Sequence, residues 1–351
     1  MKKIILILLL LITGCSKEEI KPLKQLGYTD EEISVIETMN IENVNYIENI
    51  SYNENYINLI NHENFNENNL KNYVSMINNN MISLDDIIFI VNNNYYDPNI
   101  NYNDHTLSYM KSNYYIHDNL EKYLDYENKI TEVFETNQEK INYVITSINS
   151  KVDNKFYTNT IPTDLSKGYL ILVNKYNYLS SDYVPNNLVT ISYPYGASLQ
   201  VEKTAYEAFI NMYNDAKSIG LNLYITSPYR SYNTQLGLYN RYVREDGQTL
   251  ADTYSARAGH SEHQTGLALD IIIPGGTLGG FEYTSEFKWL KDNAHKYGFI
   301  LRYPFGKEWI TGYDYEPWHY RYVGVDVATK VYNEDITFEE YYAYYIEKSS
   351  N

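Results

Sequence analysis

The sequence is poor in cysteine and in basic residues. Cys15 is the single cysteine among 351 residues, so no disulfide can form within the chain. Lys and Arg number 28 against 45 Asp and Glu, which gives a formal net charge of -17 at pH 7. Such a surface repels phosphate backbones and anionic lipid headgroups. We therefore expect no nucleic-acid partner and no charge-based attachment to membranes.

The N-terminus has no apolar run long enough to cross a bilayer. Lys2 and Lys3 precede the apolar run Ile4–Ile12, whose length suits the core of a signal peptide rather than a transmembrane helix. The following residues Ile12-Thr13-Gly14-Cys15 resemble the bacterial lipobox. This resemblance implies that residues 1–15 are a lipoprotein signal peptide and that Cys15 is lipidated. An ordinary signal peptide with a chance cysteine is the alternative. Several acyl chains would anchor the protein outside the cell membrane.

The length of the chain predicts two domains. Residues 16–140 are expected to form an array of short helices. Thr29 and Glu32 have the spacing of a capping box, in which each side chain caps the backbone of the other. Similar helix starts follow at Met39–Val44, Phe65–Leu70 and Ile82–Ile87. They suggest degenerate helical repeats of irregular spacing. No chemistry is evident here, and recruitment of a protein partner is one role open to the array.

The second half of the chain mixes strands and helices without a βαβ rhythm. Residues 141–160 are expected to be a linker or entry segment, 161–328 a catalytic domain, and 329–351 a C-terminal helix or tail. Expected strands are Tyr169–Val173, Leu221–Thr226 and Leu267–Ile273, and expected helices are Lys203–Ile219 and Thr284–Tyr297, the latter ended by Gly298. This pattern predicts an α+β fold after an α-helical N-terminal region.

A carboxylate stands inside an apolar strand pattern. Asp270 lies within Leu267–Ile273, and its side chain shares a strand face with Ala268 because strand side chains alternate. A buried carboxylate is costly unless it is paired or bound to a metal. His263 precedes the turn at Gly266 and could return over the same face. These two side chains would supply two metal ligands.

A third ligand is available in Glu316-Pro317-Trp318-His319. Two histidines and one carboxylate leave a zinc coordination position open, as in catalytic zinc sites. Glu316 could act as general base without binding the metal. Arg230 is the candidate cation for a developing oxyanion. His260 is interpreted as pocket rim or surface, while Arg302 and Lys307 could bind a peptide carboxylate or have structural roles.

These residues resemble the zinc D-alanyl-D-alanine carboxypeptidases of the VanY type. The resemblance covers about residues 160–325. Its motifs are Ser-x-His-x-x-Gly-x-Ala-x-Asp at Ser261, His263, Gly266, Ala268 and Asp270, Glu-x-x-His at Glu316 and His319, and Tyr-Arg-Ser with a downstream Gln at Tyr229, Arg230, Ser231 and Gln235. Pro228 stands where the family usually has a small residue, and Ala258 where Pro is common. Pro228 constrains Ser227 toward extended geometry.

The resemblance implies a fold shared with the hedgehog signalling domain, an antiparallel sheet flanked by helices. It implies that His263, Asp270 and His319 bind Zn²⁺ and that Glu316 is the catalytic base. Arg230 would stabilise the oxyanion or hold the substrate's terminal carboxylate. Substrate-binding roles would fall to Tyr229, Ser231, Gln235 and Ser261.

The implied activity is removal of the terminal D-Ala from peptidoglycan stem peptides. An L,D-carboxypeptidase or a peptidoglycan endopeptidase could use the same site. A non-catalytic wall-binding lipoprotein is the alternative from another class, and the complete set of ligands with Glu316 argues against it.

Overall fold

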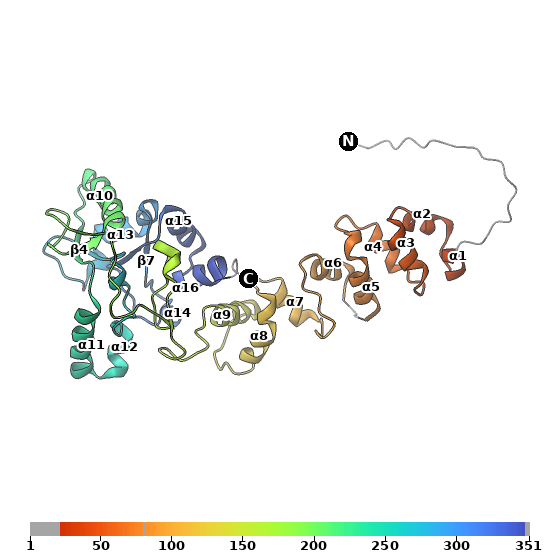
Figure 1. The fold of residues 1–351 in the computed structure, drawn as a ribbon, viewed down its shortest axis with the longest axis horizontal. Helices are drawn as coiled ribbons and strands as arrows, with labels where there is room; N and C mark the ends of the chain where they lie inside the picture. Colours follow the sequence, from red (N-terminus) through yellow and green to blue (C-terminus); the bar gives the residue numbers. More distant parts are fainter. Residues whose placement is uncertain (1–21, 80–81, 348–351) are drawn as a thin grey trace. The chain divides into compact units, whose positions relative to one another are not determined.

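A computed structural model describes residues 22–79 and 82–347 (Figure 1). The chain divides into two compact units between Lys111 and Ser112. Within the described ranges, no helix has both the length and the apolar character that a membrane crossing requires. The predicted lipidation site, Cys15, lies outside the described residues.

The first unit is helical, as the sequence predicted. Its helices are α1 (Pro22–Leu26), α2 (Asp30–Ile36), α3 (Ile41–Glu48), α4 (Asn55–Ile60), the 3-10 helix η1 (Glu67–Asn69), α5 (Leu70–Asn79), α6 (Leu84–Asn92) and α7 (Asp104–Met110). The capping box of α2 is present: the Thr29 hydroxyl accepts from the Glu32 amide, and the Glu32 carboxylate accepts from the Thr29 amide. Asn40, Asn66 and Ser83 cap the other three predicted starts.

One local arrangement occurs twice in the chain. In the first unit the Tyr73 hydroxyl bonds to the Asn92 side chain, whose amide nitrogen donates to the carbonyl of Asn64 at 2.9 Å. In the second unit the Tyr123 hydroxyl donates to Asn149 at 2.7 Å, and the Asn149 amide donates to the carbonyl of Tyr114 at 3.0 Å. The tyrosine and the carbonyl residue are each displaced by 50 positions. The asparagine is displaced by 57 positions, so the two arrangements are similar but not in strict register, and the helical repeat stays a prediction.

The second unit is built on a four-stranded antiparallel sheet with the strand order β5-β6-β8-β7. These strands are β5 (Tyr224–Ser227), β6 (Ala268–Ile272), β7 (Phe299–Leu301) and β8 (His319–Tyr322). Two small two-stranded sheets pair β1 (Ile161–Pro162) with β2 (Asn177–Tyr178) and β3 (Leu188–Thr190) with β4 (Gln200–Glu202). The predicted α+β fold with an antiparallel sheet flanked by helices is confirmed.

Helices pack against one face of the four-stranded sheet. α10 (Lys203–Ser218) contributes Phe209 and Met212, and α13 (Ser285–Asn293) contributes Leu290, to the core cluster that holds Leu269 of β6 and Tyr320 of β8. Burial of these apolar side chains is the main force that holds the layers together. Because strand side chains alternate, the polar residues that neighbour Leu269 and Tyr320 in the sequence point to the opposite face of the sheet.

The remaining helices of the second unit lie around this framework. They are η2 (His117–Asn119), α8 (Leu120–Glu127), α9 (Asn137–Asn149), η3 (Leu165–Leu170), α11 (Tyr232–Asp246), α12 (Gln248–Tyr254), η4 (Glu262–Thr265), η5 (Phe281–Tyr283), η6 (Ala294–Tyr297), α14 (Glu308–Thr311), α15 (Val325–Glu334), α16 (Phe338–Tyr341) and the π-helical η7 (Tyr342–Glu347).

The C-terminal helices pack within the second unit. Phe338 and Tyr342 share a core cluster with Leu172 and Ile300. Tyr344 stacks on Tyr114 with ring centroids 3.8 Å apart. α8 and α9 belong to this same unit. The boundary between the two units therefore lies before residue 140, the predicted end of the helix array.

The strand expected at Tyr169–Val173 is wrong. The chain forms η3 up to Leu170, and Gly168 interrupts it with φ 58°. The carbonyls of Tyr169 and Ile171 accept hydrogen bonds from Nη2 of Arg321 at 2.9 and 2.8 Å. A buried guanidinium therefore takes two of the acceptors that a strand ladder would have used.

Candidate active site

The sheet register brings two predicted metal ligands together. Asp270 of β6 pairs directly with His319 of β8, so both side chains lie on the same face. His263 lies on η4, which ends at Gly266 with φ 70°. A side chain at Gly266 would crowd the backbone of Glu202, which explains the need for glycine there. Ligand atoms of His263, Asp270 and His319 all lie within 4.8 Å of one another, and all three residues are buried.

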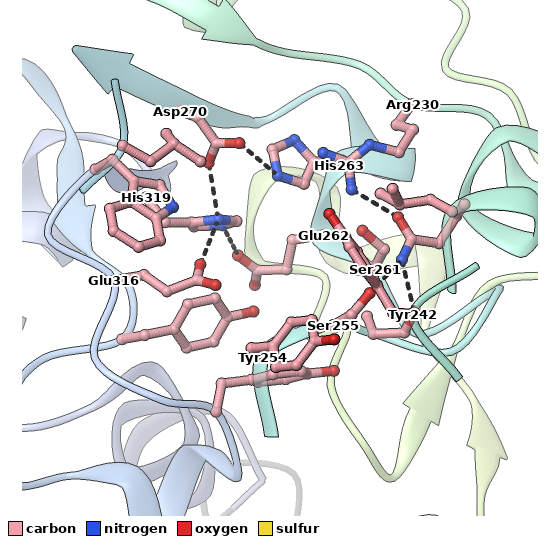
Figure 2. Close-up of a pocket in the computed structure, with 17 residues that line it drawn as sticks. Arg230, Tyr242, Tyr254, Ser255, Ser261, Glu262, His263, Asp270, Glu316 and His319 are labelled. Atoms are coloured by element: carbon pink, nitrogen blue, oxygen red, sulfur yellow. Dashed lines mark hydrogen bonds and ion pairs between the residues drawn. The ribbon is translucent and has the colours of Figure 1, made fainter. Parts of the chain in front are cut away.

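Hydrogen bonds decide which ring nitrogens face this point (Figure 2). Nδ1 of His263 bonds to the Pro228 carbonyl at 2.7 Å, so its Nε2 faces Asp270 Oδ2 at 3.4 Å. His319 is turned the other way, with Nδ1 lying 3.2 Å from Asp270 Oδ1. The two histidines thus present different ring nitrogens to the same carboxylate.

The donor set fits a divalent metal ion. Asp270 Oδ1 is buried and has no hydrogen-bond partner among the described residues. Burial opposes its ionisation, but the rings of His263 and His319 outweigh burial and hold the pKa of Asp270 below its usual range. Two imidazole nitrogens and a carboxylate are zinc ligands, and three protein ligands leave a position open for water or substrate.

Glu316 stands beside this group. Its Oε2 lies 3.3 Å from His319 Nδ1. Its amide donates to the carbonyl of Tyr303 at 3.1 Å, and its carbonyl accepts from the amide of His319 at 3.1 Å. Burial raises the pKa of the Glu316 carboxyl above its ordinary value. A carboxylate with raised basicity next to a metal site suits a general base.

Arg230 lies on the other side of His263 (Figure 2). Its backbone amide donates to the carbonyl of His263 at 3.1 Å. Its guanidinium donates to the Gln235 side-chain oxygen at 2.6 Å and to the Ser227 hydroxyl at 2.8 Å. Gln235 is buried on α11 and donates in turn to the Ala256 carbonyl at 2.6 Å. Gln235 therefore holds Arg230 in place.

A cavity of about 310 Å³ joins these groups. Its lining includes the three candidate ligands together with Glu316, Arg230, Gln235 and Ser261. Ser231 caps α11 by accepting from the Thr234 amide at 3.3 Å, and the Tyr229 amide donates to Gln200. Neither Ser231 nor Tyr229 is among the described residues that line the cavity. His260 lies outside it too, with Nδ1 bonded to the Asn174 carbonyl.

Comparisons with known proteins give the family of the chain. The VanY family model, described as D-alanyl-D-alanine carboxypeptidase, matches residues 198–325. The putative carboxypeptidase YodJ of Bacillus subtilis is 42% identical over 184 residues, covering 49% of this chain and 66% of YodJ. A D-alanyl-D-alanine carboxypeptidase of Enterococcus faecalis is 34% identical over 197 residues, covering 52% of this chain and 70% of that protein. The chain belongs to the VanY family.

A solved VanY-like structure supports the fold. The structure of the LdcB LD-carboxypeptidase aligns with a TM-score of 0.50 and 39% sequence identity, covering 53% of this chain and 91% of that chain. The chain spans about two thirds of the length of the curated relatives it matches. The VanY match ends at residue 325, before α16 and η7.

Several residues of the VanY-like site escaped the sequence analysis. Glu262 lies beside His263 and is fully buried next to His319. The sequence offered one signal for Glu262, its position directly before the candidate metal ligand His263. Three further tyrosines that line the cavity were also missed: Tyr242, Tyr254 and Tyr313. They could not be singled out, because the chain contains 41 tyrosines.

Proposed function

We propose that this protein is a zinc-dependent carboxypeptidase that hydrolyses the C-terminal D-Ala of peptidoglycan stem peptides. One observation carries the proposal: His263, Asp270 and His319 converge in a cavity that also contains Glu316 and Arg230. This combination supplies a metal site, a base and a cation in one place. The names of the VanY relatives support the choice of substrate.

Each residue of the proposed site has its own role in the hydrolysis. A zinc ion held by His263, Asp270 and His319 would polarise the scissile carbonyl and make water nucleophilic at neutral pH. Glu316 takes the proton from the attacking water and passes it to the leaving amine. Arg230, fixed by Gln235, stabilises the negative charge that develops on the carbonyl oxygen or holds the terminal carboxylate. Ser261 remains a candidate for substrate contact.

L,D-carboxypeptidase activity is the second candidate. The LdcB structure, named as an LD-carboxypeptidase, aligns over more than half of the chain and supports this reading. The two activities share the metal and the base and differ in the residue that precedes the cleaved bond. An endopeptidase acting on crosslinks would use the same site.

A location outside the cell membrane follows from a wall substrate. We infer that Cys15 carries the lipid anchor, since the lipobox resemblance places it directly after an apolar signal segment. The helices of the first unit remain candidates for binding a protein partner.

Incubation with defined stem peptides tests the proposal. Pentapeptides ending in D-Ala-D-Ala and tetrapeptides ending in L-residue-D-Ala are offered separately, and mass spectrometry identifies the product. Loss of one D-Ala from the pentapeptide alone supports D,D-activity, and loss from the tetrapeptide alone supports the second candidate. A zinc-loaded enzyme that leaves both peptides intact would contradict both.

A further inference from the structure

A neutral quartet of charged side chains lies buried behind the metal site. Glu262 Oε1 accepts hydrogen bonds from Arg302 Nε at 2.9 Å and from Arg321 Nη1 at 2.7 Å. Arg302 also donates to both carboxylate oxygens of Glu339, at 2.8 and 2.6 Å. The side chains of Glu262, Arg302 and Arg321 are 0% exposed, and that of Glu339 is 2% exposed. The charges of the two arginines and the two glutamates therefore cancel one another in a region without contact with water.

The second oxygen of Glu262 points at a metal ligand. Glu262 Oε2 lies 3.6 Å from Nε2 of His319, slightly beyond ordinary hydrogen-bond length. Both atoms are buried, and neither has a hydrogen-bond partner among the described residues. Since both Arg contacts go to Oε1, Oε2 is free to accept from the imidazole. Leaving both atoms unpaired would be costly in a buried site.

We propose that Glu262 is the positioning residue of His319: it accepts the Nε2 hydrogen and so leaves the Nδ1 lone pair for the metal. Metal-bound histidines commonly donate their other ring hydrogen to a carboxylate, which fixes the tautomer and the ring orientation. His263 follows the same rule with the opposite nitrogen, because its Nδ1 donates to the Pro228 carbonyl. This inference rests on the metal site of the proposed function.

Arg302 and Arg321 explain how a buried glutamate can serve in this role. Both guanidinium groups donate hydrogen bonds to Glu262 Oε1, so the buried carboxylate is paired with positive charge. Glu339 of α16 balances the second positive charge. Glu339 lies beyond the residues that the VanY family model matches, so the C-terminal segment contributes to the support of this ligand.

Replacement of Glu262 by Gln is the decisive change. The Glu262→Gln side chain would keep the size and an acceptor for the two arginines, but its amide group would face Nε2 of His319 as a donor. That arrangement favours the tautomer with hydrogen on Nδ1, the atom needed by the metal. Glu339→Gln is the matched control, because it removes the same charge from the quartet without touching His319.

The measurement is competition for Zn²⁺ between the metal-free full chain and a chromophoric chelator, with unfolding temperatures recorded for each variant. We expect Glu262→Gln to bind zinc roughly 10- to 100-fold more weakly than wild type. We expect Glu339→Gln to bind zinc almost as tightly as wild type, although both variants unfold at lower temperature. Equal zinc affinities in the two variants would overturn the positioning role. A wild-type chain that binds no zinc would instead overturn the proposed function, and this inference with it.

A second measurement needs no substitution and covers the case in which Glu262→Gln does not fold. Long-range ¹H–¹⁵N spectra of the zinc-loaded wild type report which nitrogen of each of the seven histidines carries hydrogen. We expect hydrogen on Nε2 of His319 and on Nδ1 of His263. Hydrogen on Nδ1 of His319, with the metal on Nε2, would contradict the proposal.

Discussion

The imidazole of His263 donates its Nδ1 hydrogen to the carbonyl oxygen of Pro228 at 2.7 Å. Pro228 is a departure from the usual family pattern, and its fixed geometry bears on the placement of Arg230. Ser227 ends strand β5, in agreement with the extended geometry that a following proline favours. The Arg230 amide then donates to the carbonyl of His263. Two hydrogen bonds thus join the segment Pro228–Arg230 to the metal-ligand candidate His263.

Removal of a metal ligand should empty the site. His263→Ala or Asp270→Ala leaves two ligands, so we expect each variant to lose bound zinc while the wild type holds one ion. Elemental analysis of the purified full chain measures this. His260→Ala is the control, since His260 bonds to Asn174 outside the cavity and should keep its zinc. Full zinc occupancy in both ligand variants would show that the ligands are misassigned.

Glu316→Gln separates catalysis from binding. The variant keeps the size of the side chain but loses its basicity, so we expect kcat to fall by about 10² to 10⁴. Zinc content and substrate affinity should stay close to the wild-type values. Steady-state kinetics on the active stem peptide, together with zinc analysis, provide the test. Near-normal turnover would rule out Glu316 as the base.

Arg230→Ala distinguishes two roles of the guanidinium. If it faces the developing oxyanion, kcat should fall by roughly 10² to 10³. If it holds the terminal carboxylate in ground and transition states alike, KM should rise with little change in kcat. We favour the first outcome. Gln235→Ala should change the same parameter to a smaller extent, because the Gln235 side chain holds the guanidinium of Arg230 in place. Unaltered kinetics in Arg230→Ala would exclude both roles.

Lys175 should make stability depend on pH. Its ammonium group lies 4.3 Å from the Tyr313 ring centroid, and burial lowers its pKa from 10.5 to about 8. Between these values the unfolded chain binds more protons than the folded chain, so stability rises with pH. We therefore expect the free energy of unfolding of wild type, relative to Lys175→Met, to increase from pH 8 to pH 10.5. Denaturant titrations at both pH values measure it. A difference in unfolding free energy that does not change with pH would contradict the lowered pKa of Lys175.

Cys15→Ala tests the lipid anchor. Without the thiol there is no acylation, and the net charge of -17 offers no substitute attachment to anionic lipids. We expect wild type in the membrane fraction and the variant in the soluble fraction after a salt wash. A variant that stays with the membranes would place the anchor elsewhere.

The local elements were largely predictable from sequence. The capping box at Thr29 and Glu32 formed as expected, because it needs only neighbouring residues. Gly266 and Gly298 adopt the positive φ that their positions predicted. The strand at Tyr169–Val173 failed for a non-local reason: Arg321, some 150 residues later, takes the carbonyls of Tyr169 and Ile171.

The sequence by itself determined which chemical groups are available: two histidines, an aspartate, a glutamate and an arginine in recognisable motifs. Only the tertiary structure decided how they are oriented. The β6–β8 register set Asp270 against His319. The support of Glu262 came from Arg302, Arg321 and, through Arg302, from Glu339, which lie 40 to 77 residues further along the chain. Such contacts carry no local pattern, because burial and charge balance select them only after distant segments have packed together.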